Sequence, residues 1–259
     1  MRIRPLGGRV LPALLTALFL QSCGIEAYYY LTPVSAGNIV SSVNQQATIA
    51  LPGVSASYFT NFAMYYRIYV SYSNRTGFST SARDLQDINP TLYSDYNYLS
   101  AYTNATNSTT ANIASVMANR GYHLLHFEES GGNVSSDILT SPGVQLQIAF
   151  PPQPSATYPY PYLSYQGGRI AMLKRSNGNG AFSPLPEDRY FVNRPALNEA
   201  ANITSTVNAD VVNAGSSSAG QRNTYVSVYI VTAGLNEQTY TQIFSIPTFV
   251  GIFMLPTYQ

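Results

Sequence analysis

The clearest pattern of side chains along the chain is an alternation between Asn61 and Val70, NFAMYYRIYV. Side chains that recur at every second position share one face of an extended strand. The segment is therefore predicted to be a strand. One face would carry Phe62, Met64, Tyr66, Ile68 and Val70, and the other would carry Ala63, Tyr65, Arg67 and Tyr69.

Further strand-like runs are expected at 122–127, 144–150, 169–175, 225–232, 240–245 and 248–255. The run YYYLTP, which ends at Pro33, is expected to form a first edge strand. The segment SNGNG at 176–180 predicts a turn between strands. We expect 151–165, PPQPSATYPYPYLSY, to be a loop, because proline cannot join the ladder of a central strand.

Two helices are predicted between these strands. Asn89 and Pro90 form a typical helix start, with an N-cap followed by proline at the first helical position. The apolar stripe that follows contains Leu92, Tyr96 and Leu99. A second helix is expected from Thr109 or Thr110 to Gly121, burying Ile113, Val116 and Met117.

Composition agrees with a mainly β protein. Hydrophobic residues make up 45% of the 259 positions, so the chain has enough apolar material for a sizeable core. Tyrosine occurs 22 times, tryptophan is absent, and charged residues make up only 10%, well under the usual level of about 25%. Charges are scattered and form no basic stripe, so nucleic-acid binding is not expected.

The first 22 residues have the order of a signal peptide. MRIRPLGGR is basic, and Val10 to Leu20 is an apolar run of eleven residues, shorter than the roughly 20 that a membrane-spanning helix needs. Leu20-Gln21-Ser22-Cys23-Gly24 then resembles a bacterial lipobox, which implies cleavage before Cys23 and lipid attachment to it. Gln21 departs from the small or β-branched residue favoured there. Several acyl chains would hold such a protein stably on a membrane.

Other interpretations of Cys23 remain open at this stage. It has no second cysteine with which to form a disulfide, but it could be a buried thiol or an exposed one left by ordinary secretion. Secretion without lipid would make the chain a glycoprotein, because N-x-S/T sequons occur at five positions. These positions are Asn74, Asn104, Asn107, Asn133 and Asn202.

Two segments support a family resemblance. NFAMYYRIYVS resembles a central strand of fibronectin type III-like domains, and TYVSVYIVTAGLNEQ with the later SIP resembles their penultimate strand and its turn. Together with the short leader and the many tyrosines, these two segments make the chain similar to spirochaetal, treponeme-like lipoproteins. The resemblance implies an Ig-like or fibronectin type III-like β-sandwich and no activity. Ser227 departs from an apolar core face, so Val226, Val228 and Ile230 are an alternative buried set.

The expected organisation is thus a signal peptide at 1–22, a lipidated tether with a first edge strand at 23–46, and one β-sandwich at 47–259. Because such a sandwich has about 100 residues, long loops and two short helices near 89–120 would be insertions. A bacterial cell-envelope location follows from Cys23. The sequence does not say which membrane or which face of it carries the protein.

Candidate chemistry is sparse. His123 and His126, followed by Glu128 and Glu129, would share a zinc-binding face only on a helix, whereas the local text favours a strand with the histidines on opposite sides. The adjacent carboxylates are expected to be solvated. No nucleophile with a recognisable base, calcium loop or phosphate loop occurs, so we expect no catalytic residues, metal or cofactor.

The remaining candidates are tyrosines. Tyr158, Tyr160 and Tyr162 alternate with prolines on the expected loop, where they could contact a protein or glycan partner or simply cover the edge of the sandwich. We therefore expect a binding or scaffolding module without catalysis. The alternative is a glycan-acting envelope enzyme with carboxylates about 5–10 Å apart in a cleft.

Overall fold

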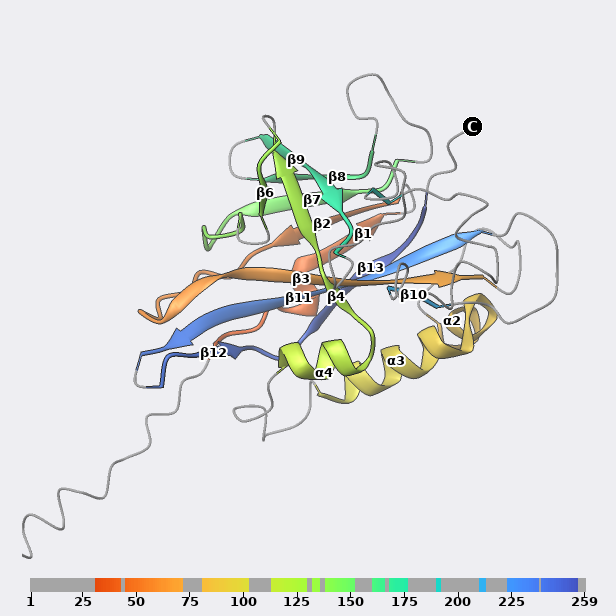
Figure 1. The fold of residues 1–259 in the computed structure, drawn as a ribbon, viewed down its shortest axis with the longest axis horizontal. Helices are drawn as coiled ribbons and strands as arrows, with labels where there is room; N and C mark the ends of the chain where they lie inside the picture. Colours follow the sequence, from red (N-terminus) through yellow and green to blue (C-terminus); the bar gives the residue numbers. More distant parts are fainter. Residues whose placement is uncertain are drawn as a thin grey trace, which may run out of the picture.

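The computed structural model describes residues 31–42, 45–71, 81–102, 113–129, 132–135, 138–151, 160–165, 168–176, 190–191, 210–212, 223–237 and 239–255. Within these ranges the protein is mainly β and forms two sheets. Their arrangement is consistent with a β-sandwich, with helices on one side (Figure 1).

The first sheet, sheet A, has seven strands in the order β1-β2-β7-β8-β9-β5-β6, and each neighbouring pair is antiparallel. Its strands are β1 (Ile39–Ser42), β2 (Gln46–Ala50), β5 (His126–Glu129), β6 (Val134–Ser135), β7 (Gln145–Ala149), β8 (Tyr162–Tyr165) and β9 (Arg169–Lys174).

The second sheet, sheet B, is built around one long antiparallel pair, β3 (Phe59–Val70) and β11 (Thr224–Asn236). Shorter strands extend it: β4 (His123–Leu124), β12 (Thr241–Phe244) and β13 (Thr248–Met254) pair antiparallel with these two, and β10 (Val211–Val212) pairs parallel with β3.

The core confirms the predicted alternation. Phe62, Met64, Tyr66, Ile68 and Val70 point between the sheets, together with Val226, Val228 and Ile230 of β11. Sheet A contributes Ile49, Phe127, Leu146, Ile148, Leu163 and Leu173 to the same cluster. Val226, Val228 and Ile230 are therefore the set of β11 that faces the main core.

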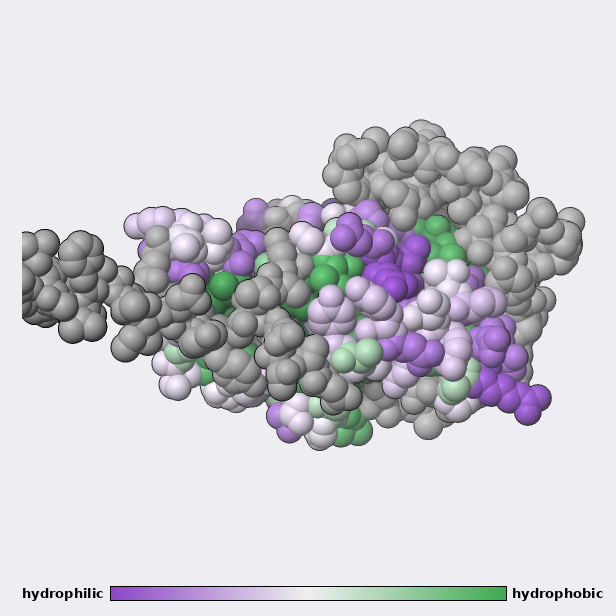
Figure 2. All heavy atoms as spheres, turned by 90° about the horizontal axis from the view of Figure 1, so that it is seen from below, coloured by the Kyte–Doolittle hydropathy of each residue, from purple (hydrophilic) through white to green (hydrophobic). Residues whose placement is uncertain are grey.

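The opposite face of sheet B is also buried, because helices cover it. Tyr65 and Tyr229 pack with Leu99, Ile113 and Met117. Tyr69 and Tyr225 pack with three further helix residues, namely Leu85, Ile88 and Leu92. From the side of the helices the surface is a mosaic of hydrophilic and neutral residues with separate hydrophobic spots (Figure 2).

The described residues contain three α-helices, where the sequence predicted two. The additional one is α2 (Ala82–Ile88), capped by Ser81, whose hydroxyl accepts from the Asp84 N–H. The predicted start of α3 (Pro90–Ala101) is confirmed, since the Asn89 side chain accepts from the Thr91 N–H. Helix α4 (Ile113–Asn119) is followed by Gly121 in the left-handed conformation. No helix in the described ranges is long and apolar enough to cross a membrane.

Three predictions about strands were wrong. The single strand expected at 122–127 is two strands, β4 in sheet B and β5 in sheet A. Residues 162–165 were expected in a loop but form β8, which lies inside sheet A between β7 and β9. The proline-rich segment ends at Pro161, so the backbone N–H groups of the four residues after it can take part in strand pairing. Of the expected edge strand YYYLTP, residues 28–30 lie outside the described ranges and residues 31–33 form no strand. The edge strand of sheet A is β1 at 39–42. The turn expected at 176–180 lies outside the described residues beyond Ser176.

Candidate functional site

The outer face of sheet A carries a row of side chains across three strands. Tyr162 of β8 is opposite Met172 of β9, which is opposite Glu128 of β5. Their neighbours in sequence, Leu163 and Leu173, point into the core, so these three side chains point to the opposite face. All three are partly exposed. The described helices pack on the outer face of sheet B, not on this face.

A second aromatic group lies beside this row. The ring of Tyr160 stacks flat on that of Tyr190, with 3.8 Å between the centroids and 7° between the planes. The Tyr190 hydroxyl donates to Glu128 at 2.9 Å, and Lys174 forms an ion pair with the same carboxylate while its ammonium lies 5.3 Å from the centroid of the Tyr190 ring. Tyr160 thus packs on a ring that is itself held by the Lys174–Glu128 pair.

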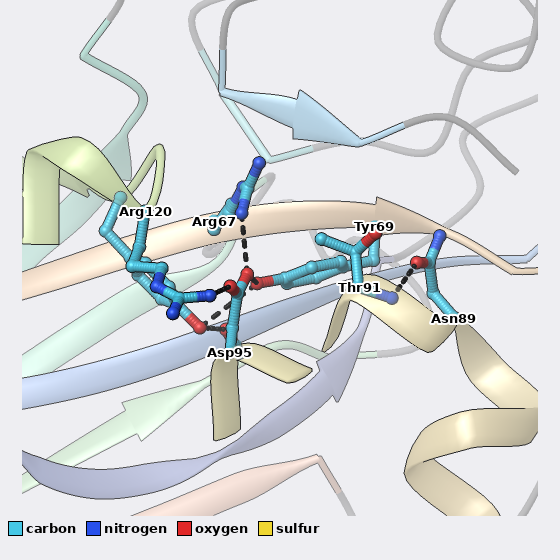
Figure 3. A network of polar contacts seen from close by, with 8 residues as sticks. Arg67, Tyr69, Asn89, Thr91, Asp95 and Arg120 are labelled. Carbon is cyan, nitrogen blue, oxygen red and sulfur yellow. Dashed lines mark hydrogen bonds and ion pairs between the residues drawn. The ribbon is translucent and has the colours of Figure 1, made fainter. Parts of the chain in front are cut away.

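The most connected polar cluster lies under the helices, around Asp95 of α3 (Figure 3). Its carboxylate accepts from Arg67 Nη1 of β3 at 2.6 Å and from the Tyr69 hydroxyl at 2.8 Å, and Arg120 Nη1 approaches at 3.5 Å. Asp95 is 1% exposed. These contacts join α3, the end of α4 and β3, so the cluster fastens the helical layer to sheet B.

The cluster continues inward as a chain of hydroxyls. The Tyr69 and Tyr122 hydroxyls are 3.1 Å apart, and those of Tyr122 and Ser227 are 2.8 Å apart. Because each hydroxyl has one proton and Tyr69 gives its proton to Asp95, the chain is polarised toward the carboxylate. Burial, followed by the nearby Tyr122 and Asp95, raises the pKa of Tyr69 well above its ordinary value. Tyr69 therefore stays a neutral donor.

A separate buried ion pair joins Arg175 to Asp210, next to the edge of β3 that pairs with β10. Arg175 holds Asp210 with two bonds, Nε to Oδ2 at 2.8 Å and Nη2 to Oδ1 at 2.6 Å. The Tyr66 hydroxyl donates to the same carboxylate at 2.8 Å and accepts from the Ser176 N–H at 2.7 Å. Burial alone would raise the pKa of Asp210, but Arg175 and the hydrogen bonds hold it below its ordinary value. The Asp210 carboxylate is thus ionised and bonded to Arg175 and Tyr66.

The two histidines of the candidate zinc motif lie apart, but not on opposite faces of one strand at 122–127 as the sequence predicted. His123 lies on β4 and pairs with Tyr66 in sheet B, whereas His126 lies on β5 in sheet A. The described ranges contain no group of three His, Cys, Asp or Glu side chains that could hold a metal ion. The sequence predicted that Glu128 and Glu129 are solvated turn residues, and this was wrong. Both lie in β5, where Glu128 pairs with Lys174 and Glu129 pairs with Arg169.

The predicted site residues have different outcomes. Cys23 and Tyr158 lie outside the described residues. Tyr160 and Tyr162 are described and partly exposed, but the structure places Tyr162 in a strand and Tyr160 in a stack with Tyr190. Sequence reasoning missed Tyr190, because it lies far along the chain from Tyr160.

Sequence reasoning also missed Asp95, for which there was a signal. Leu92, Asp95 and Leu99 are three and four positions apart, so they share one face of α3. A charged residue within an apolar stripe requires a partner when the stripe is buried. The identity of that partner was not readable, since Arg67 lies on a strand of another part of the chain.

No protein-family model matches the chain, and no curated protein or solved structure shows significant similarity to it. What the protein does must therefore be inferred from its own residues.

Proposed function

We propose that this protein is a lipid-anchored protein of the bacterial cell envelope, and that its folded part is a binding or scaffolding module without catalysis. The basic and apolar leader, followed directly by Leu20-Gln21-Ser22-Cys23-Gly24, is the observation that carries the anchoring. The Ig-like or fibronectin type III-like character of the sandwich, with its likeness to spirochaetal lipoproteins, belongs to the same proposal and rests on the two segments quoted above.

The entry of the chain into the sandwich supports an anchor at Cys23. Val34 is 1% exposed, and its carbonyl accepts from the Thr248 hydroxyl at 2.5 Å. The carbonyl of Thr32 accepts from the Thr232 hydroxyl at 2.7 Å. The chain is thus packed against sheet B from Leu31 onward, eight positions after Cys23. A lipid on Cys23 would hold the whole sandwich close to the membrane.

The outer face of sheet A is the proposed binding surface. It carries the ring of Tyr162 and the thioether of Met172 beside the Glu128–Lys174 pair, and the described helices pack on sheet B instead. Tyrosine supplies a large contact area and a hydrogen-bonding group at little cost in entropy. A protein or glycan partner fits such a face. Catalysis has less support, because the carboxylates of Asp95, Asp210 and Glu128 are each engaged by Arg or Lys.

Intact-mass analysis of the protein from its native source tests the anchor. We expect a chain that begins at Cys23 and carries a diacylglyceryl group on sulfur. Cys23→Ser is the matched control, since it should be neither acylated nor retained with membranes on fractionation. A native chain that begins elsewhere, or a Cys23 without acyl chains, would refute the proposal. Glycans on the sequon at Asn133 or its counterparts would favour the secreted alternative.

A further inference from the structure

The hairpin between β11 and β12 carries the most exposed large hydrophobic side chain of the described residues. Tyr240, at the tip, is 81% exposed. Its backbone is left-handed, with φ at 53°, a conformation that costs a non-glycine residue free energy. The hairpin is nevertheless well formed, because the Tyr240 N–H donates to the Asn236 carbonyl at 2.7 Å and the Thr239 N–H donates to the Asn236 side chain. The Tyr240 ring is therefore exposed beside a strand end that these two hydrogen bonds fix.

The N-terminal segment enters the sandwich from the side of this hairpin. The contacts of Val34, Thr32 and Leu31 follow β11 in order toward its end. Val34 bonds Thr248, which pairs with Ile230; Thr32 bonds Thr232; and a Cδ atom of Leu31 lies beside Gly234. Followed backward, the chain thus runs toward Asn236 and the hairpin tip (Figure 1).

The distance to the anchor is short. Eight positions separate Leu31 from Cys23, and eight fully extended residues span at most about 26–29 Å. Gly234 lies two residues before the end of β11, about 7 Å along the strand. A membrane that holds the lipid on Cys23 is therefore within reach of the hairpin.

The surroundings of the hairpin suit a bilayer surface. The Leu235 N–H donates to the carbonyl of Tyr58, which places the loop 51–58 beside the hairpin, and the Gly143 N–H donates to Pro52 in that loop. The segments 51–58 and 138–144 contain no charged residue, and Glu237 is the one charge of the turn. Few charges would have to be desolvated at the headgroups, and tyrosine is favoured where one end of a side chain is apolar and the other is wet.

We infer that the β11–β12 hairpin is the membrane-facing contact of the anchored protein, with the Tyr240 ring at the level of the lipid headgroups. This inference rests on the proposed function, because it requires the lipid on Cys23. One tyrosine without neighbouring cations binds a bilayer weakly, so the contact would orient the anchored sandwich and would not recruit it.

The absence of tryptophan makes the test direct. Lipidated, full-length Tyr240→Trp would be reconstituted into zwitterionic phosphatidylcholine vesicles that contain a brominated lipid. Gln86→Trp is the matched control: Gln86 is an exposed residue of α2, whose buried side chains pack with Tyr225 at the far end of β11. Tyr225 and Gly234 are about 30 Å apart along the strand.

We expect the tryptophan emission of the Y240W protein to shift to the blue and to be quenched by the brominated lipid, and that of Q86W to be unchanged. The quenching should persist in high salt, because no cationic residue of the hairpin drives the contact. Combining Tyr240→Trp with Cys23→Ser should abolish it. Vesicle flotation of the same samples reports the anchor separately. A protein that floats with vesicles but shows no quenching of Y240W beyond that of Q86W would overturn this inference and leave the proposed anchor intact.

Discussion

Replacing Asp95 by Asn should destabilise the protein by far more than an ordinary surface substitution. Asn has nearly the same volume and still accepts hydrogen bonds, but it removes the charge that faces Arg67 and Arg120. The side chains of Asp95 and Arg67 are 2% and 18% exposed, so the Arg67 cation would remain largely desolvated. Breaking a buried ion pair costs about 3–5 kcal/mol, and the partial exposure of Arg67 places the expected loss near ~3 kcal/mol.

Urea unfolding followed by circular dichroism measures this loss as a shift in the midpoint at constant slope. Glu129→Gln is the matched control, because its partner Arg169 is 57% exposed and exposed pairs contribute only about 0–1 kcal/mol. A double-mutant cycle with Arg67→Met should give a coupling energy in the upper part of the range of about 0.5–3 kcal/mol found for contacting residues.

The reasoning would be refuted if Asp95→Asn cost no more than Glu129→Gln, or if the cycle showed no coupling. Either result would mean that the apolar packing of Leu92 and Leu99 holds α3 in place without the ion pair. A changed slope would have a different meaning, namely that the helical layer unfolds apart from the sandwich.

Three further substitutions test other contacts by the same measurement. Gly121→Ala should lower the free energy of unfolding more than Gly132→Ala. Both glycines are left-handed, which penalises alanine by about 1–2 kcal/mol, but only at 121 would the added Cβ meet the Arg67 guanidinium, at 2.9 Å. Equal losses would contradict this. Tyr229→Phe should leave stability unchanged or raise it by up to about 1 kcal/mol, because its buried hydroxyl has no hydrogen-bond partner among the described residues; a clear loss would reveal one. The folded-state pKa of Asp210 lies below its ordinary 3.8, so its contribution to stability is present above pH 3.8 and is lost as the pH falls through the folded-state pKa. Asp210→Asn should therefore lower stability at neutral pH and flatten its fall in acid, and an unchanged acid profile would contradict the ionised pair.

The long strands of sheet B were predictable because their pattern is local. In β3 the alternating positions are read directly from ten neighbouring residues, and apart from Arg67 both sets are apolar or aromatic since both faces are buried. The start of α3 was equally local, as Asn89 and Pro90 suffice to define it. Helix α2 was missed because its buried positions, Leu85 and Ile88, are too few to show a helical period.

The polar clusters could not be predicted because their partners are far apart in sequence. Arg175 and Asp210 meet only when β9 and the segment before β10 converge on β3. The stack of Tyr160 on Tyr190 also depends on the arrangement of distant segments. For the strand β8, the prolines before Tyr162 argued for a loop, but strand pairing with β7 and β9 determined the outcome.

The long pairing of β3 with β11 has a consequence for how the chain becomes folded. Phe62 pairs with Thr232 and Val70 with Thr224, so β3 can pair with β11 only after the long intervening segment has been made. The loop closed by this pairing is long, and contacts of such separation in sequence slow folding. As the chain emerges from a ribosome or an export channel, β3 remains unpaired until the residues of β11 have also emerged. Refolding of the intact chain should accordingly be slow, and truncation before residue 224 should leave β3 exposed to aggregation.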